Sequence, residues 1–399
     1  MPARARPPVS LVAYVYDYVE YVGELLDSVF AQTFGDFELF FLDDGSTDGT
    51  GDVVRSYRDP RLRYVRQERA GRDRLDATFN RCVAETSGEL IAVVNGDDRW
   101  HPRKLELQVP LLQRYPLLDV SFHDVEITDA AGNVRPGSFR PPVPDVVLHA
   151  GRLGPYQLHR NLIPNPTVVF RRSVVERIGP QQRGWMHDYD FWLRAAVARC
   201  RFHFLPDRLL RYRVHERSHS TSSLRAARIA AESRAMRLAR RAEYTIEQLY
   251  PEIAQCRDVA FAHACAHVDL AVLLATGAEP LLELAEAELN AALRFVPGWP
   301  LAQHDLAVIE LVLGRLDAGL ARLASVATGG DSLASRNLEL ARAGERCALR
   351  LAALDPEQCE LLQLRALPDP LVTSVATPSR PDARIDPRSL AISALLRSA

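Results

Sequence analysis

Residues 9–50 read VSLVAYVYDYVEYVGELLDSVFAQTFGDFELFFLDDGSTDGT, and this stretch decides the fold. The segments Val9–Tyr16 and Glu38–Leu42 are short, rich in β-branched or aromatic residues, and bounded by turn residues, which predicts strands. Val19–Gln32 lies between them and has the apolar spacing of a helix. Strand, helix and strand in this order indicate an α/β domain with a mostly parallel sheet.

The same alternation continues beyond residue 50. Strands are predicted over Arg63–Val65 and Leu90–Val94, and helices over Gly49–Tyr57 and Arg74–Glu85. Right-handed crossovers in such a sheet place the loops that follow the strands at one edge, where ligands bind. We expect this α/β domain to occupy residues 1–222.

The second half of the chain has a different character. From residue 223 it is rich in Ala, Leu, Arg and Glu at helical spacing, which predicts an all-α domain over 223–367 with helices at Leu224–Tyr250 and Ile253–Thr276. The step of 34 residues from Ala292 to Val326 is the tetratricopeptide period, with a generic helical hairpin as the alternative. Residues 368–399 are rich in Pro, Ser and Asp, which predicts a flexible tail.

Composition excludes several classes of protein. The 399 residues carry a net charge of −2, so no overall field favours nucleic acid or anionic lipid as a partner. All basic residues except Lys104 are Arg, and their even scatter favours genome composition over phosphate recognition as the reason. No apolar stretch approaches the ~20 residues of a transmembrane helix. The 6 cysteines show no CxxC spacing, which indicates neither zinc nor disulfides and favours a cytoplasmic protein.

Two acidic clusters directly follow predicted strands. The run 43–48, DDGSTD, offers carboxylates to base N–H groups and ribose hydroxyls, while its Gly and Ser suit a tight turn and a helix cap. The run 95–98, NGDD, places two carboxylates side by side, an arrangement that a shared divalent cation relieves. The plain alternatives are an Asx-turn with a helix cap for the first run and an exposed turn for the second.

Two further clusters come later in the α/β domain. The run HDYDFWLR at 187–194 predicts the start of a helix, with Asp188 and Asp190 in the first turn, where the helix dipole stabilises negative charge. Either carboxylate is a candidate catalytic base or a simple helix cap. The run RYRVHERS at 211–218 is basic and aromatic, and its His215 is a candidate ligand or phosphate contact, or a structural histidine.

Taken together, these clusters resemble inverting family 2 glycosyltransferases of the GT-A fold. The opening stretch carries the resemblance, and supporting segments follow in the same order. They are Asn80 with Gly88–Ile91, NGDDRWHPRKLE, NPTVVFRRSVVERIG, HDYDFWLRAA and YRVHERSHS. The resemblance covers roughly residues 8–222 and implies a nucleotide-diphospho-sugar transferase domain that uses a nucleotide-sugar donor.

The resemblance also implies roles for individual residues. The implied donor contacts are Tyr16, Asp43, Asp44, Ser46, Asp97, Arg211 and Arg213. The implied ligands of Mg²⁺ or Mn²⁺ are Asp97, Asp98 and His215, and the ion would stabilise the departing diphosphate. Asp188 would be the general base that deprotonates the acceptor, and a single displacement would invert the anomeric centre.

This chain departs from the family pattern at three positions. Asn95 stands where the metal motif usually begins with Asp, so we expect fewer anionic ligands for the ion. Asp17 replaces the Asn that commonly follows the early Tyr. His187 replaces the Glu that commonly precedes the base, and a histidine there is expected to titrate near neutrality and make activity sensitive to pH.

The acceptor is the least specified partner, because fold alone does not choose it. The leading expectation is a saccharide or lipid-linked acceptor in surface polysaccharide or glycoconjugate synthesis, met at the membrane only transiently. A peptide or protein acceptor is the first alternative, with the helical half serving acceptor or homodimer contacts, an arrangement that resembles some peptide glycosyltransferases. A non-catalytic nucleotide-sugar-binding scaffold is the second. A nucleotidyltransferase is disfavoured, since Val15–Glu20 contains no Gly, Lys or Arg.

Overall fold

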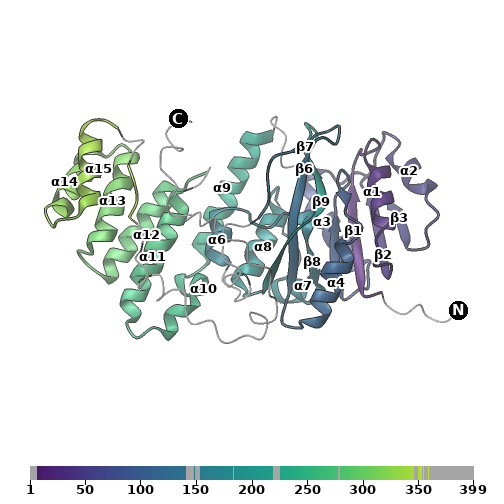
Figure 1. The fold of residues 1–399 in the computed structure, drawn as a ribbon, viewed down its shortest axis with the longest axis horizontal. Coiled ribbons are helices and arrows are strands. Elements are labelled where there is room, and N and C mark those ends of the chain that lie inside the picture. The colour runs from purple at the N-terminus through teal and green to yellow at the C-terminus, as the bar shows by residue number, and fades with distance from the viewer. Residues whose placement is uncertain are drawn as a thin grey trace. The chain divides into compact units, whose positions relative to one another are not determined.

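The computed structural model describes residues 7–140, 148, 153–182, 184–218, 225–276, 279–345, 349–352, 354 and 358. The chain forms two compact units (Figure 1). The first, here called the sheet unit, comprises Met1–Gly154 and Asn161–Met236, and the second, the helical unit, comprises Pro155–Arg160 and Arg237–Ala399. We retain the sequence boundaries at 1–222, 223–367 and 368–399 as a proposal; the last segment lies outside the described residues.

One mixed sheet organises the sheet unit. Its strands are β1 (Val9–Val15), β2 (Phe37–Asp43), β3 (Leu62–Arg66), β4 (Leu90–Val94), β5 (Arg99–Trp100), β6 (Val120–Thr128), β7 (Val134–Arg135), β8 (Val169–Arg171) and β9 (Phe202–Arg213). Their order is β3-β2-β1-β4-β8-β6-β9-β5, and β7 pairs with β6. Strands β1 to β4, β6 and β9 run in one direction, whereas β5, β7 and β8 run against them. The expected α/β fold with a mostly parallel sheet is therefore confirmed.

Helices cover both faces of this sheet. They are α1 (Val22–Phe30), α2 (Thr50–Ser56), η1 (Arg72–Arg74), α3 (Leu75–Ala84), α4 (Lys104–Arg114), η2 (Asn165–Thr167), α7 (Arg172–Ile178), α8 (His187–Val197) and the beginning of α9 (Ala226–Glu243). The four predicted strands and the three predicted helices between them are confirmed, with ends that shift by at most three residues.

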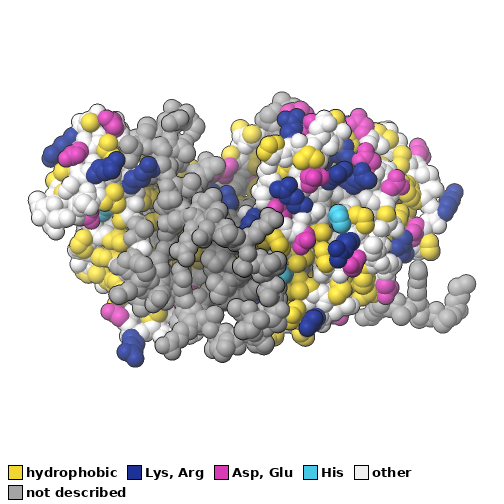
Figure 2. Space-filling view, in the orientation of Figure 1, with side chains coloured by type: hydrophobic (Ala, Val, Ile, Leu, Met, Phe, Trp, Pro, Cys, Tyr) yellow, Lys and Arg dark blue, Asp and Glu magenta, His cyan; other side chains and the backbone are white. Residues whose placement is uncertain are grey.

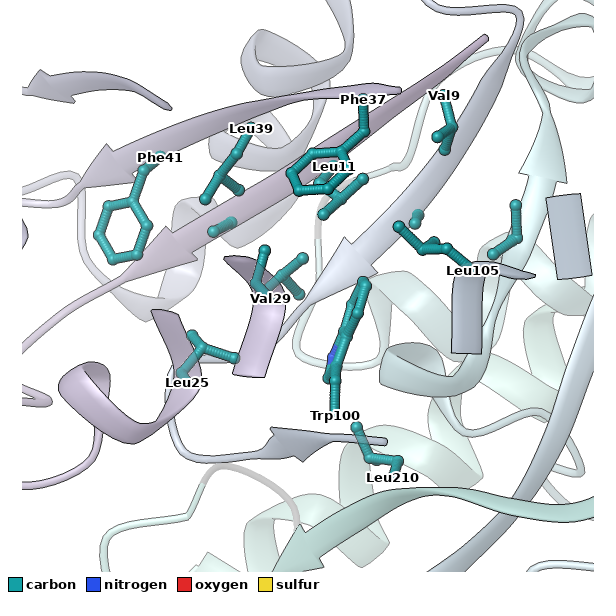
Figure 3. Close-up of a cluster of buried hydrophobic side chains, with 14 of the residues drawn as sticks. Val9, Leu11, Leu25, Val29, Phe37, Leu39, Phe41, Trp100, Leu105 and Leu210 are labelled. Carbon is teal, nitrogen blue, oxygen red and sulfur yellow. The ribbon is translucent and has the colours of Figure 1, made fainter. Parts of the chain in front are cut away.

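Alternation along β1 separates the two hydrophobic cores of this unit. Val9, Leu11, Ala13 and Val15 point to one face, where they pack with side chains of α1 and α4. Figure 3 shows Leu25 and Val29 of α1, Leu105 of α4 and the β2 side chains Phe37, Leu39 and Phe41 converging there. Burying each such Leu or Phe contributes about 2 kcal/mol, which fixes the register of the central strands.

The opposite face of β1 packs against aromatic side chains. Tyr14 meets Phe79 of α3 edge to face, with ring centroids 6.0 Å apart, and Phe79 in turn meets Phe191 of α8 at 6.3 Å. Trp192 of α8 lies 5.3 Å from Phe170 of β8. Aromatic packing thus docks the beginning of α8 against the sheet and sets the position of the residues at its N-terminus.

The helical unit is built from helices and one 3₁₀ turn. They are α6 (Gly154–His159), the end of α9, α10 (Ile246–Leu249), η4 (Pro251–Gln255), α11 (Val259–Ala275), α12 (Leu282–Phe295), α13 (Pro300–Val312), α14 (Leu316–Ala327) and α15 (Ser332–Arg342). From α11 onward each helix packs on the next. Helix α14 begins 34 residues after α12, whereas α13 begins 41 residues after α11, so the tetratricopeptide-like repeat stays a prediction.

Two local features define the helices of this unit. The predicted helix at Ile253 begins instead at Val259, because Asp258 caps it by accepting a hydrogen bond from Phe261 N, and Pro251–Gln255 form a 3₁₀ turn. Arg237 is buried and donates to Leu158 O at 2.7 Å and Glu279 O at 2.9 Å, which ties α6 to this unit. Among the described residues, no helix has the length and apolarity to cross a bilayer.

Charged side chains are mixed over the visible surface. Figure 2 shows Arg side chains, in dark blue, interspersed with Asp and Glu rather than gathered into one basic field. This mixture agrees with the even scatter of Arg along the sequence. The single lysine differs from these arginines, because Lys104 is fully buried and donates from Nζ to Gln108 Oε1 at 2.7 Å and Thr167 O at 3.1 Å.

Candidate functional site

The C-terminal ends of the co-directional strands bring the sequence clusters to one edge of the sheet. Tyr16 follows β1, Asp44 follows β2, Gln67 follows β3, Asn95 follows β4 and Val214 follows β9. Residues from far apart in the sequence therefore meet in one place, as the parallel topology predicts.

Asp43 and Asp44 are both buried, and their carboxylates hold loops in place. Asp43 accepts from Ser46 N and from the Tyr64 hydroxyl, each at 2.7 Å. Burial and this hydrogen bond raise the pKa of Tyr64 to about 12, so the phenol keeps its proton. Asp44 accepts from Ala70 N at 2.7 Å and Gly71 N at 3.0 Å. The two carboxylates thus shape the loops that follow β2 and β3.

The loop after β1 is pinned to the loop after β2. Asp17 has φ of 57°, and its backbone N–H donates to Ser46 Oγ at 3.0 Å. Thr47 N donates back to Asp17 Oδ1 at 2.8 Å, and Tyr18 N donates to Thr50 Oγ1 at 2.8 Å. The predicted site residue Ser46 is therefore one of the groups that fix the position of Tyr16 beside it in the site.

Sequence reasoning missed Arg69, which lies on the loop after β3. Its guanidinium stacks over the Tyr16 ring at 3.6 Å from the centroid, and it also donates to the Tyr16 hydroxyl. Gly45 adopts φ of +79°, and a Cβ there would lie 3.0 Å from Arg69 N, so glycine permits this close approach. The basic run RQERAGR at 66–72, directly after a parallel strand, was the signal that could have found this residue.

Asp97 and His215 form the centre of the site. The His215 ring Nε2 lies 3.1 Å from Asp97 Oδ2, and both side chains are nearly buried. The His215 ring packs against Tyr21 with centroids 4.9 Å apart. Gly96 makes the turn possible, since a Cβ there would lie 2.7 Å from the Tyr18 ring. The structure therefore brings together two of the three predicted metal ligands.

Asp98 has a different hydrogen-bond partner from this pair. It accepts from Arg213 N at 3.1 Å through Oδ1, whereas Oδ2 is buried and has no hydrogen-bond partner among the described residues. Burial, together with the neighbouring Asp97 carboxylate, raises the pKa of Asp98 well above its usual range. A cation beside the two carboxylates would relieve this repulsion, as expected from the sequence.

Arg213 is buried and fully occupied by the protein. Its Nε donates to Asp97 O and its Nη1 to Ala130 O, each at 3.0 Å, and Nη2 pairs with Glu24 Oε2 at 2.9 Å. The guanidinium also lies over the Tyr21 ring at 4.6 Å. These contacts favour a role in holding the Asp97 turn rather than the predicted direct contact with the diphosphate.

Arg211 occupies a different environment on the same strand. Its side chain is about half exposed and pairs with Glu126 at 2.7 Å. No contact in the described residues joins it to Asp97 or His215, so the structure does not bring Arg211 into the central group. Its predicted contact with the donor stays a prediction.

The donor set at Asp97 and His215 fits a divalent cation. A carboxylate oxygen and an imidazole nitrogen suit Mn²⁺ well, whereas Mg²⁺ prefers oxygen ligands alone. Within the described residues, no group of three or more His, Cys, Asp or Glu side chains forms a complete cage. A bound ion would therefore take its other ligands from donor phosphates and water, which is the usual arrangement for a metal that serves phosphate chemistry.

Asp188 lies at the start of α8 and remains half-buried. Its Oδ1 accepts from Tyr189 N at 2.8 Å, and among the described residues no group donates to Oδ2. Burial and the Asp188 charge both raise the pKa of Tyr14, which places Asp188 near the C-terminal end of β1. Asp190, the other candidate base, forms a buried ion pair with Arg194 at 2.9 Å. The geometry therefore leaves Asp188 as the accessible carboxylate.

His187 does not fit the expectation of titration near neutrality. The ring is buried, and its Nδ1 donates to Gln181 Oε1 at 2.6 Å. Burial lowers the pKa of His187 despite the nearby carboxylates, so the ring is neutral at pH 7. The sequence position suggested a pH-sensitive group, whereas burial of the ring at the start of α8 favours its neutral form.

Comparison with known proteins defines the class. Residues 10–179 match the family model of glycosyl transferase family 2. The putative glycosyltransferase EpsE of Bacillus subtilis is 28% identical over 215 residues, which cover 53% of this chain and 74% of that protein. An uncharacterised glycosyltransferase of Rickettsia felis is 30% identical over 224 residues, covering 54% of this chain and 35% of that one.

Solved structures give a weaker likeness. TarS of S. aureus is 17% identical with a TM-score of 0.48, and the match covers 85% of this chain and 54% of that one. This likeness carries no inference about ligands. The family match, the relatives and the α/β sheet together define the protein as a glycosyltransferase of the GT-A fold. More specifically, the part of the chain that matches glycosyl transferase family 2 is residues 10–179.

Proposed function

We propose that this protein is a metal-dependent inverting glycosyltransferase that moves a sugar from a nucleotide-diphosphate sugar to an acceptor hydroxyl. One observation carries the proposal. Asp97 and His215 meet at 3.1 Å at the sheet edge where Asp188, on a different element, presents a carboxylate oxygen with no donor among the described residues. A single displacement at the anomeric carbon requires two groups, a cation site for the diphosphate and a general base for the acceptor hydroxyl. In this proposal both lie at the same edge of the sheet.

The residues of the chain bind and orient the donor in this proposal. Tyr16, stacked on Arg69, offers an aromatic surface for the base, and the loops held by Asp43 and Asp44 line the nucleoside. Asp97 and His215 would hold Mn²⁺ or Mg²⁺. When bound, the ion neutralises the charge that develops on the departing diphosphate. Arg213 keeps the Asp97 turn in place by its contact with the backbone carbonyl.

Asp188 accepts the proton of the acceptor hydroxyl in this proposal. Its Oδ2 accepts the proton of the acceptor hydroxyl as that oxygen attacks the anomeric carbon, and Oδ1 stays fixed by the Tyr189 amide. Attack from the face opposite the diphosphate inverts the configuration, so an α-linked donor gives a β-linked product. Tyr14 and His187 beside the carboxylate are both neutral at pH 7.

The acceptor we propose is a saccharide or lipid-linked saccharide of a surface polysaccharide or glycoconjugate. The four cysteines whose state is described are free, which supports a reducing, cytoplasmic location.

A peptide or protein acceptor is the second candidate. The consecutive helix pairs of the helical unit, with α12 and α14 starting 34 residues apart, favour it, because stacked helix pairs present surfaces for chain segments or a second copy.

A donor panel tests this function. Purified protein is incubated with UDP-glucose, UDP-N-acetylglucosamine or GDP-mannose and MnCl₂, and release of the nucleoside diphosphate is measured with and without EDTA. The proposal predicts release from at least one donor, abolished by EDTA and by the variant Asp97→Ala. Binding of a donor in calorimetry without release, for every donor and every added saccharide, would instead establish the non-catalytic scaffold.

A further inference from the structure

His187 lies directly before the proposed base and is joined by hydrogen bonds to a second helix. Its Nδ1 donates to Gln181 Oε1 at 2.6 Å, and Gln181 is itself paired with Asn80 of α3. We propose that His187, through Gln181 and Asn80, is the positioning residue that fixes Asp188 for proton transfer. The inference rests on the proposed role of Asp188 as the base.

The link between Gln181 and Asn80 is a double hydrogen bond. Asn80 Nδ2 donates to Gln181 O at 2.8 Å, and Gln181 N donates to Asn80 Oδ1 at 2.9 Å. The Asn80 side-chain amide thus hydrogen-bonds to both the backbone N–H and the backbone C=O of Gln181, as a neighbouring β-strand would. Because the Gln181 side chain then holds His187, the beginning of α8 is fixed relative to α3.

Other contacts hold the rest of the loop that leads into α8. Arg194 donates from Nη2 to Pro180 O at 2.8 Å, while its Nε pairs with Asp190 at 2.9 Å. Trp185 Nε1 donates to Asp73 Oδ1 at 2.7 Å. The loop before the base is therefore anchored at Pro180 and Trp185 as well as at His187, and His187 is the anchor adjacent to Asp188.

Charge explains why a histidine suits this place. His187 faces Asp76 of α3, together with Asp188 and Asp190 of its own helix, and the charge of Asp190 is compensated by Arg194. A neutral ring supplies a hydrogen-bond donor here without adding another negative charge. A glutamate at this position would place a further carboxylate beside Asp188 and disfavour the ionised form of Asp188.

Four variants of the full chain test the inference by nucleoside diphosphate release from the donor panel with MnCl₂. His187→Ala and Asn80→Ala are each expected to lower the rate by about 10- to 100-fold through misplacement of the base. His187→Gln, which keeps an N–H donor, is expected to retain the rate within about threefold. His187→Glu is expected to shift the acid limb of the rate profile up by about one pH unit. Donor affinity, measured by calorimetry, stays unchanged in all four.

Controls and outcomes separate this inference from the proposed function. His101→Gln and Asn290→Ala alter exposed residues outside the site and should leave rate and profile unchanged. Wild-type rates in both alanine variants, with the acid limb of His187→Glu unmoved, would overturn the positioning role. Full turnover in Asp188→Asn would instead overturn the base assignment. If thermal melting shows that His187→Ala does not fold, the rate of Asn80→Ala and the pH profile of His187→Glu test the positioning role in its place.

Discussion

Replacing the buried Arg213 by methionine tests how the Asp97 turn is held. The change removes the guanidinium but keeps an apolar stem of similar length. Nε and Nη1 no longer donate to Asp97 O and Ala130 O, and the contact with Glu24 disappears. The Arg213 backbone N–H still donates to Asp98, so the strand itself is not altered.

The expected loss of stability follows from these contacts. Two hydrogen bonds from a charged donor to carbonyl oxygens are together worth about 3 kcal/mol. The pair with Glu24, whose side chain is 52% exposed, adds at most about 1 kcal/mol after solvent screening. Stacking over Tyr21 adds about 0.5 kcal/mol. Packing of the methionine side chain recovers part of this free energy. We therefore expect the free energy of unfolding to fall by about 3 kcal/mol.

Two measurements and one control make the prediction specific. Urea unfolding followed by tryptophan fluorescence gives the free energy of unfolding, and electron paramagnetic resonance of free Mn²⁺ in the presence of UDP gives the metal affinity. Arg208→Met on the same strand is the control, since that side chain is half exposed and lies 3.9 Å from Asp124. The control should change stability by less than about 1 kcal/mol and leave Mn²⁺ affinity unchanged.

Arg213→Met is expected to weaken Mn²⁺ binding by at least about tenfold, because the Asp97 turn loses its side-chain support. Wild-type stability together with wild-type Mn²⁺ affinity would refute the reasoning. A loss of UDP affinity measured without metal, at unchanged stability, would favour instead the direct diphosphate contact predicted from the sequence.

Three further predictions concern packing and pH. Gly96→Ala should distort the metal turn and weaken Mn²⁺ affinity in the same resonance assay, because its Cβ would lie 2.7 Å from the Tyr18 ring. Lys104→Arg should lower the urea midpoint by the equivalent of about 1–3 kcal/mol, because the larger guanidinium must enter a fully buried site. Burial lowers the pKa of His159 from 6.5 to about 4, although its ring donates to Leu273 O. The unfolded chain therefore binds the additional proton, and stability should fall by up to about 3 kcal/mol as the pH falls from about 6.5 to about 4. Urea unfolding across this range should show a smaller fall in His159→Gln, and an equal fall would contradict the assignment.

The sequence predicted the first half of the sheet well because its signals are local. Strands β1 to β4 are short apolar runs bounded by turns, and their alternation with helices specifies parallel pairing. Strands β5 to β9 were not predicted. β9 pairs with β6 across some eighty residues, and β8 inserts between β4 and β6, so their pairing depends on tertiary contacts that no local pattern encodes.

The candidate site was predicted in its composition but not in its detailed contacts. The clusters at 43–48, 95–98, 187–194 and 211–218 follow from residue type and strand position, and the structure brings the first two to one edge with His215. Which arginine is buried could not be read from the sequence, because Arg211 and Arg213 both lie on the edge of a basic run. Burial likewise decides that His187 is neutral.

The most direct test of the account is the turnover of Asp188→Asn. The substitution keeps the shape of the side chain and its contact with the Tyr189 amide but removes the proton acceptor. Nucleoside diphosphate release with MnCl₂ should fall by about 10²- to 10⁴-fold, while donor affinity in calorimetry stays within about threefold of wild type. Full turnover in this variant would contradict the assignment of Asp188 as the general base.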